Sequence, residues 1–420
     1  MSDSVIKCEN VFKIFGANAE KMLKDSNGVV DAKTFQENGC IVGVNNASFE
    51  VSKGEMLVVM GLSGSGKSTL LRCISRLTDA TGGKIFIEGQ DLLKLNNKEL
   101  IDLRRNKMGM VFQSFALLPH KTVVENIAFP LQIKGIEIDD SISKAMDMVK
   151  LVGLEGRENY FPRELSGGQQ QRVGIARSLA VEPDIWFLDE PFSALDPLIR
   201  KEMQDEFLRL QDKLQKTIMF ITHDFDEALK LADRIAIMKD GTIEQLDTPA
   251  NIVLNPATEY VRKFTEEVPR EKVLLIEDVM DKSVTNNLSD FKISKDEIIE
   301  NVAEKILTQE KSVSVIDSNN KIVGSINPTK ITTEIILDIF LIIPCFIHYF
   351  FSPQKQYELF LKDEQFQQFY YFHQLHLQIF LELKSFQLHF QLFHFLKLLY
   401  HSNYQRLVRP LHLLLLKLFP

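Results

Sequence analysis

The stretch MLVVMGLSGSGKST at residues 56–69 constrains the fold of this chain more than any other. Its first five residues are apolar and predict a buried strand, and GLSGSGKS matches the pattern G-x-x-x-x-G-K-[ST]. The apolar spacing of TLLRCISRL, residues 69–77, predicts a helix directly afterwards. A glycine-rich turn between a strand and a helix points several backbone N–H groups at one place, and the helix dipole adds positive charge there. The sequence therefore predicts a phosphate-binding loop in an α/β domain.

The backbone and the side chains of this loop have separate expected tasks. Glycine allows the backbone to curl around phosphate oxygens. Lys67 is expected to reach the β- and γ-phosphates of a bound nucleotide, and the Ser68 hydroxyl is expected to coordinate Mg²⁺. The residues predicted to hold the phosphates are Gly61, Leu62, Ser63, Gly64, Ser65, Gly66, Lys67, Ser68 and Thr69.

The wider pattern between about residues 41 and 245 is typical of an α/β fold. Short β-branched runs alternate there with amphipathic stretches, which predicts a buried, largely parallel sheet. The expected central strands are MLVVM (56–60), IWFLD (185–189), TIMFIT (217–222) and RIAIM (234–238).

Polar side chains follow two of these strands. Asp189 suits the coordination of Mg²⁺, and Glu190 suits the polarisation of an attacking water. His223 follows TIMFIT, where an imidazole could contact the γ-phosphate and hold the water in line with Glu190. Gln113, in MVFQSFALLPH, carries an amide that could touch both Mg²⁺ and water. We therefore predict Glu190, His223 and Gln113 as catalytic residues, and Ser68, Gln113 and Asp189 as the metal ligands.

A second glycine turn, LSGGQQQR at 165–172, lies about a hundred residues after the first. Ser166 can cap a helix there, and the early N–H groups of that helix form another anion site. One chain holds a single γ-phosphate, which the first loop already surrounds. We therefore expect the second turn to serve the nucleotide of a neighbouring copy, in a two-fold homodimer that buries two ATP molecules.

These motifs, in this order, resemble the ATPase subunit of an ABC transporter over about residues 10–265. GLSGSGKST corresponds to Walker A, Gln113 to the Q-loop, LSGGQ to the signature motif, IWFLDE to Walker B, SALD at 193–196 to the D-loop and His223 to the switch histidine. The resemblance implies that ATP is hydrolysed with Mg²⁺ and that Phe15 stacks on adenine. It adds the following residues of the second turn and the D-loop to the ATP contacts: Ser166, Gly167, Gly168, Gln169 and Asp196.

A longer segment at 17–42, with GLSGSGKSTLLRCISRL and MVFQSFALLPHKTVVENIAF, is similar to importers of glycine betaine, proline betaine and choline. This resemblance implies separate permease subunits and a periplasmic or surface substrate-binding protein. It places the chain at the cytoplasmic face of the inner membrane as a peripheral subunit. A helical subdomain at about 113–165 would receive the permease. Import of another small solute, such as an amino acid, is the alternative.

Three domains are expected along the chain. Residues 1–265 form the ATPase domain, and a linker follows it. At 276–330 the order of helix, SVSVID, SNNK and KIVGSIN resembles a single CBS repeat, and a small unrelated βαβ unit is the alternative.

The third expected domain, 331–420, is a tail of atypical composition. It has no glycine, alanine or methionine, but seven of the nine histidines and fourteen of the thirty phenylalanines. Folded domains need glycine for turns and small residues for close packing, so we interpret the tail as out-of-frame translation. The alternative is a membrane segment at 335–351, which is short for a span and contains Asp338.

Charge and cysteine content exclude several classes of protein. The net charge of −8 offers no general positive field for nucleic acid, so no nucleic-acid partner is expected. Four widely spaced cysteines fit neither a zinc site nor a disulfide framework. The N-terminus lacks the pattern of a secretory signal. A non-transport ABC ATPase of DNA repair or translation is a further alternative, which the acidic balance disfavours, and a nucleotide sensor would not need Glu190.

Overall fold

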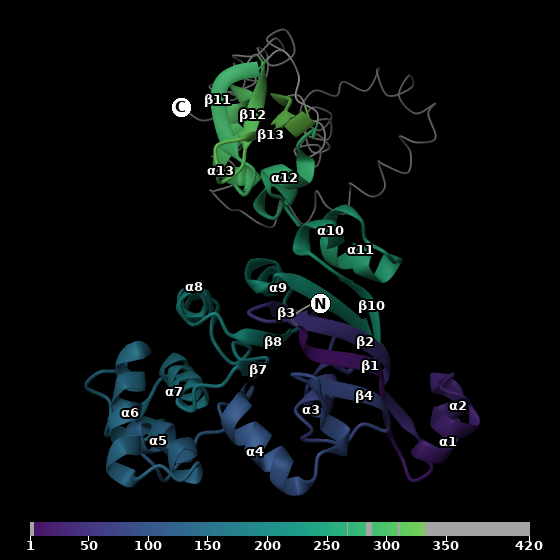
Figure 1. Ribbon diagram of the computed structural model, residues 1–420, viewed down its shortest axis with the longest axis vertical. Helices are drawn as coiled ribbons and strands as arrows, with labels where there is room; N and C mark the ends of the chain where they lie inside the picture. Colours follow the sequence, from purple (N-terminus) through teal and green to yellow (C-terminus); the bar gives the residue numbers. More distant parts are fainter. Residues whose placement is uncertain (1–3, 267, 283–287, 310, 329, 332–420) are drawn as a thin grey trace, which may run out of the picture. The chain divides into compact units, whose positions relative to one another are not determined.

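The computed structural model describes residues 4–266, 268–282, 288–309, 311–328 and 330–331. Figure 1 shows the course of the chain. It divides into two units, 1–329 and 330–420. The second unit lies almost wholly outside the described residues, and so do the predictions made for the tail and for the candidate membrane segment.

A six-stranded sheet, in the order β10-β9-β3-β8-β7-β6, carries the four strands expected at the centre. Its pairs are parallel except for β10, which runs antiparallel to β9. The strands are β3 (Met56–Met60), β6 (Met108–Val111), β7 (Ile185–Asp189), β8 (Thr217–Thr222), β9 (Arg234–Lys239) and β10 (Thr242–Asp247). The four predicted central strands and the largely parallel sheet are thus confirmed.

The central strands are apolar throughout because both of their faces are covered. In β3, Met56, Val58 and Met60 belong to a core shared with helices. Leu57 and Val59 point to the other face and belong to a second core, since successive side chains of a strand face opposite sides.

The second core lies under an antiparallel sheet in the order β2-β1-β4-β5. Its strands are β1 (Ser4–Phe15), β2 (Ile41–Ser52), β4 (Gly82–Ile87) and β5 (Gln90–Asp91). This sheet was not predicted from the sequence. Its strands are half-exposed and alternate in burial, and such strands have no continuous apolar run to mark them.

Eight of the eleven helices in residues 4–266 begin at an Asn, Asp, Ser or Thr whose side chain accepts a backbone N–H of the first turn. The eleven helices are α1 (Ala19–Asp25), α2 (Ala32–Glu37), α3 (Lys67–Ile74), α4 (Asn97–Lys107), α5 (Val123–Ile133), α6 (Ile138–Leu151), α7 (Gly167–Leu179), α8 (Pro197–Leu214), α9 (Phe225–Leu231), α10 (Pro249–Leu254) and α11 (Glu259–Thr265). Short 3-10 helices occur at Leu92–Lys94 and Pro162–Glu164.

Helices α5 and α6 fall within the region predicted as a helical subdomain, and Figure 1 shows them grouped with α7. Their apolar faces share one core, which includes Ile127, Leu131 and Val149. In the segment 17–42, α1 and α2 bury Leu23 and Phe35 in a small separate cluster. That segment therefore folds as a packed insertion between β1 and β2.

Within the first of the two units, the described residues between 270 and 328 form a small α+β unit with a three-stranded sheet in the order β11-β12-β13. Its elements are a 3-10 helix at Arg270–Lys272, α12 (Ile276–Val279), β11 (Leu288–Ser294), α13 (Ile299–Leu307), β12 (Ser312–Ile316) and β13 (Ile322–Ile326). The expected helix, strand, turn and strand are present, and β12 and β13 pair antiparallel. Strand β11, parallel to β12, was not predicted. Membership of this unit in the CBS class stays a prediction.

No helix in the part of the chain that the structure describes is long and apolar enough to cross a membrane.

Candidate active site

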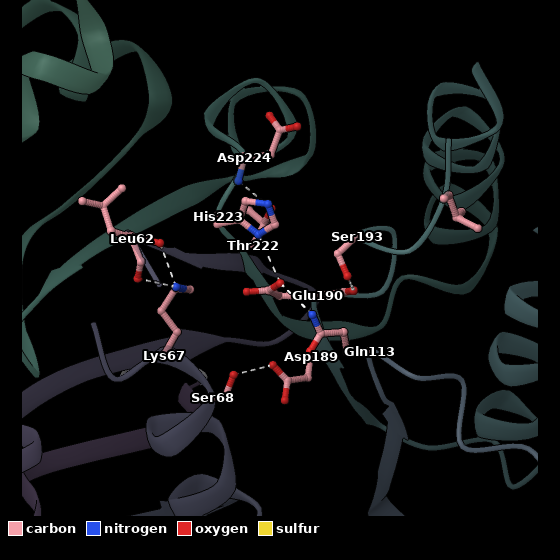
Figure 2. A network of polar contacts seen from close by, with 12 residues as sticks. Leu62, Lys67, Ser68, Gln113, Asp189, Glu190, Ser193, Thr222, His223 and Asp224 are labelled. Carbon is pink, nitrogen blue, oxygen red and sulfur yellow. Dashed lines mark hydrogen bonds and ion pairs between the residues drawn. The ribbon is translucent and has the colours of Figure 1, made fainter. Parts of the chain in front are cut away.

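The candidate site lies where three neighbouring parallel strands end. Strands β3, β8 and β7 are adjacent in the sheet, so the residues that follow them meet at one edge. The phosphate loop follows β3, the acidic pair ends β7, and His223 follows β8. Figure 2 shows their side chains converging, with Gln113 approaching from the segment after β6.

The phosphate loop is shaped by close backbone contacts that only glycine permits. A Cβ at Gly61 would lie 2.2 Å from the Met238 carbonyl oxygen, and one at Gly66 would lie 2.1 Å from that of Gly43. Gly64 faces open space, but its φ of 83° is one that L side chains rarely adopt. The loop is therefore held against β9 and β2, and it stays open on the side of Gly64.

Lys67 is buried, and no carboxylate among the described residues is hydrogen bonded to it. Its Nζ donates to the carbonyl oxygens of Gly61 at 2.7 Å and Leu62 at 2.9 Å. Burial lowers the pKa of Lys67, and the charges of Glu190 and Asp189 oppose that shift. A phosphate anion in the loop would supply the charge that these neutral partners lack.

Ser68 and Asp189 lie together at the first turn of α3. The Ser68 hydroxyl donates to Asp189 Oδ1 over 2.8 Å. Burial raises the pKa of Asp189, and the Ser68 hydrogen bond and the charge of Arg72 lower it. A carboxylate and a hydroxyl are ligands that Mg²⁺ prefers. The pair fits the metal that the sequence predicted, although Gln113 is bonded elsewhere in this structure.

Glu190 is the centre of a three-residue polar contact. Its Oε2 lies 3.1 Å from His223 Nδ1 and accepts from Gln113 Nε2 at 3.2 Å. The carboxylate of Glu190 is mostly buried, whereas His223 is about half exposed. The structure thus brings together the three residues predicted as catalytic.

The backbone of Glu190 stands in the left-handed region, with φ of 45°. Its N–H donates to the carbonyl oxygen of Ile221 on β8, and the carbonyl oxygen of Glu190 accepts from the Ser193 hydroxyl. Non-glycine residues seldom adopt this conformation, and such strain is concentrated at functional sites. These bonds turn the Glu190 side chain toward the end of β8.

The second glycine turn is built as expected but is not joined to the phosphate loop. Ser166 caps α7, accepting from Gln169 N–H at 3.4 Å while Gln169 reaches back to Ser166 N–H. Asp196 caps α8, and its side chain accepts from the Ile199 N–H at 3.1 Å. No hydrogen bond or ion pair among the described residues connects 166–169 with 61–69. Within one chain this turn remains separate from the loop.

Phe15 lies at the end of β1, and 44% of its surface is exposed. Lys13 Nζ lies 4.9 Å from the centre of its ring. The ring is available for stacking, which is what the predicted adenine contact requires.

Two contacts of the phosphate loop were missed by sequence reasoning. The N–H of Gly241 donates to Ser65 O at 2.9 Å, and Tyr260 Oη accepts from Leu62 N–H at 3.4 Å. The pair Asp240-Gly241 between two apolar runs is a hairpin signal that could have located the turn of β9 and β10. Nothing in that signal, however, says that the turn packs on the loop.

A P-loop ATPase combines a phosphate-binding loop, side chains that suit Mg²⁺ and a glutamate that can activate water. In this chain the side chains that suit Mg²⁺ are Ser68 and Asp189, and Glu190 lies in contact with His223. The model of the family "ABC transporter" matches residues 44–193. The trimethylamine N-oxide transport system ATP-binding protein TmoW of Pelagibacter ubique is 88% identical over 331 residues, which cover 79% of this chain and 97% of that protein. TmoW of Ruegeria pomeroyi is 64% identical over 65% of this chain and 81% of its own length.

A further relative, the glycine betaine transport ATP-binding protein OpuAA of Bacillus subtilis, is 51% identical over 67% of each chain. The chain belongs to the ABC transporter family and is one of its ATP-binding subunits, an ATPase whose hydrolysis powers transport. The resemblance to the transporters of betaines is thereby confirmed.

Proposed function

We propose that this chain powers the import of trimethylamine N-oxide. The observation that carries the proposal is the 88% identity to TmoW of Pelagibacter ubique across nearly the whole of that protein. Trimethylamine N-oxide was not among the three solutes expected from the motifs. It shares with glycine betaine and choline a positively charged nitrogen bearing three methyl groups, so one subfamily can serve all of these solutes.

Glycine betaine is the second candidate, because OpuAA is 51% identical over two thirds of this chain. Selection between the two solutes falls to other subunits. A methylated cation is recognised by aromatic rings arranged as a cage, and the sequence shows no such arrangement before residue 331. The further partners are permease subunits and a periplasmic or surface substrate-binding protein. This chain would work at the cytoplasmic face of the inner membrane.

The working unit is a homodimer with two ATP molecules between its subunits. The turn 166–169 places the N–H groups of Gly167 and Gly168 at the start of α7, and no hydrogen bond among the described residues joins it to its own phosphate loop. In a two-fold dimer, each turn closes the loop of the other subunit. Phe15 stacks on adenine, and Lys67 binds the β- and γ-phosphates.

Hydrolysis is assigned to the residues at the strand ends. Glu190 takes a proton from water as its oxygen attacks the γ-phosphorus, the bond to the β-phosphate oxygen breaks, and ADP and phosphate are left. His223 keeps Glu190 and the γ-phosphate aligned, and Gln113 orients the water. Ser68, Asp189 and Gln113 would hold Mg²⁺, which would supply positive charge to offset the charge of the phosphates. Closure on ATP and reopening after hydrolysis then move the permease.

The test is solute uptake by the complete transporter. The chain is expressed with its permease subunits and binding protein in cells that lack uptake of methylated amines, and the entry of labelled trimethylamine N-oxide and glycine betaine is compared. We expect trimethylamine N-oxide to enter at least about tenfold faster at equal low concentration. A Glu190→Gln chain gives the background. Faster entry of glycine betaine would contradict the proposal in favour of the second candidate.

A further inference from the structure

Arg177 of helix α7 makes two short hydrogen bonds to the segment that follows Gln113. Its Nη1 donates to Ala116 O at 2.6 Å, and its Nη2 donates to Phe115 O at 2.9 Å. The part of the chain that the structure describes contains no ion pair to this guanidinium. Burial of the group lowers the pKa of Arg177. A half-buried cation that binds only carbonyl oxygens is costly, and surface packing alone does not call for one.

The two residues whose carbonyls it binds share an unusual backbone. Phe115 and Ala116 have φ of 60° and 48°, two consecutive left-handed residues, and neither is glycine. Each such residue costs about 1–2 kcal/mol, so the turn needs bonds that hold it in place. The planar guanidinium presents two parallel N–H donors, a geometry that suits adjacent carbonyl oxygens.

The same segment is anchored at both of its ends. Gln113 bonds Glu190 at the start. At the other end, the fully buried Asn126 of α5 donates to the carbonyl oxygens of Leu118, Lys121 and Thr122, and accepts from Leu118 N–H. Arg177 is therefore the middle of three attachments, and it comes from the helix that begins with the second glycine turn.

We propose that Arg177 is a positioning residue that holds the 114–116 turn so that Gln113 reaches Glu190, and that it couples this turn to helix α7. Any displacement of Gln113 is then passed to the helix whose first residues serve the partner's nucleotide. The inference rests on the role proposed above for Gln113. The single substitution of Gln113 tests that role separately.

The experiment is a double-mutant cycle on ATP hydrolysis by the full chain. Arg177→Met, Gln113→Ala and the double variant are compared for kcat and for the Kd of ATP. We expect Arg177→Met to lower kcat by about tenfold or more while the Kd of ATP changes by less than about twofold. Because Arg177 acts through Gln113, the double variant should be no slower than Gln113→Ala, within about twofold.

Arg104 of α4 provides the matched control. It is also half-buried and also donates to two neighbouring backbone carbonyl oxygens, Ser75 O at 3.2 Å and Arg76 O at 2.6 Å, but it has no bond to the 114–116 turn. Arg104→Met should lower the midpoint of thermal unfolding and leave kcat within about threefold, and that effect should multiply with the effect of Gln113→Ala. If Arg177→Met does not fold, Arg177→Lys, which keeps the positive charge, replaces it in the double-mutant cycle.

Two results would overturn the inference. One is a loss of kcat in Arg177→Met that multiplies with Gln113→Ala, as in the control, because Arg177 then supports the fold in general. The other is a normal kcat in Arg177→Met. A normal kcat in Gln113→Ala alone would instead remove Gln113 from the proposed reaction centre, and with it the residue through which Arg177 acts.

Discussion

Gly66 has a backbone conformation that only glycine adopts easily, with φ of 101°, and a Cβ on this residue would lie 2.1 Å from the Gly43 carbonyl oxygen. We expect Gly66→Ala to displace the phosphate loop from β2 and to weaken ATP binding by about a hundredfold or more. Gly39 offers a matched control, since its φ of 73° is also left-handed but nothing lies within 4 Å of its Cβ position.

Gly39→Ala should cost about 1–2 kcal/mol in the free energy of unfolding, with unchanged affinity for ATP. Titration calorimetry with ATP and denaturant unfolding measure the two effects. Equal loss of ATP affinity in both variants would show that the close contact at Gly66 is not what shapes the loop.

We assign Glu190 as the general base that takes a proton from the attacking water. Glu190→Gln keeps the shape of the side chain and removes the base, so we expect ATP to bind normally and kcat to fall by about 10²–10⁴-fold. Dimers closed on ATP should accumulate and be visible by size-exclusion chromatography with ATP and Mg²⁺. Glu202→Gln, an exposed position on α8, serves as the control. Turnover at the normal rate in Glu190→Gln would remove the residue from this role.

At the scale of elements, the contact between α8 and α9 holds a buried carboxyl group. Glu227 of α9 accepts from Gln204 of α8 at 2.9 Å, and both side chains are buried. Burial raises the pKa of Glu227 above its ordinary value of 4.5, against hydrogen bonds from Thr222 and Gln204 that lower it. These helices follow Asp196 and His223, so their packing positions two parts of the candidate site.

A carboxyl group with a raised pKa binds more protons in the folded state than in the unfolded state. The free energy of unfolding therefore falls as the pH rises from 4.5 through the folded pKa, by at most about 1.4 kcal/mol per pH unit for one group. We expect Glu227→Gln to be at least as stable as the natural chain at pH 7 and to lose this part of the pH dependence. Urea unfolding between pH 4.5 and pH 8 measures it. If the free energy of unfolding of Glu227→Gln had the same pH dependence as that of the natural chain, burial would not raise the pKa of Glu227 in the folded state.

At the scale of the whole molecule, the prediction concerns the sharing of sites between two copies. Ser166→Arg fills the second turn and should abolish ATP hydrolysis, and Lys67→Ala should do the same by emptying the phosphate loop. In a mixed dimer, the intact loop of one subunit faces the intact turn of the other. Random mixing should therefore restore up to about a quarter of the natural rate. Two inactive variants that stay inactive when mixed would argue against shared sites.

Features were predicted correctly from the sequence where chemistry needs particular residues at fixed spacing. The phosphate loop needs glycine at 61 and 66, and continuous apolar runs are typical of strands buried on both faces, so these features were predicted. The antiparallel sheet was missed, because its half-exposed strands carry a weaker pattern. The interpretation of residues 331–420 as out-of-frame translation remains a prediction. TmoW of Pelagibacter ubique is matched over 97% of its length, while about a fifth of this chain stays unmatched.

The order of motifs along the chain by itself determined the family, the ATPase activity and the residues brought to the strand ends. Only the tertiary structure decided which polar groups meet. Along the sequence, Arg177 is more than sixty residues from the carbonyl groups that it binds. Gly241 is still further from Ser65, whose carbonyl oxygen accepts from its N–H. Both contacts join a side chain or an N–H to a backbone oxygen, and every residue has such an oxygen, so the type of the partner residue leaves no signal. Folding alone selects the partner.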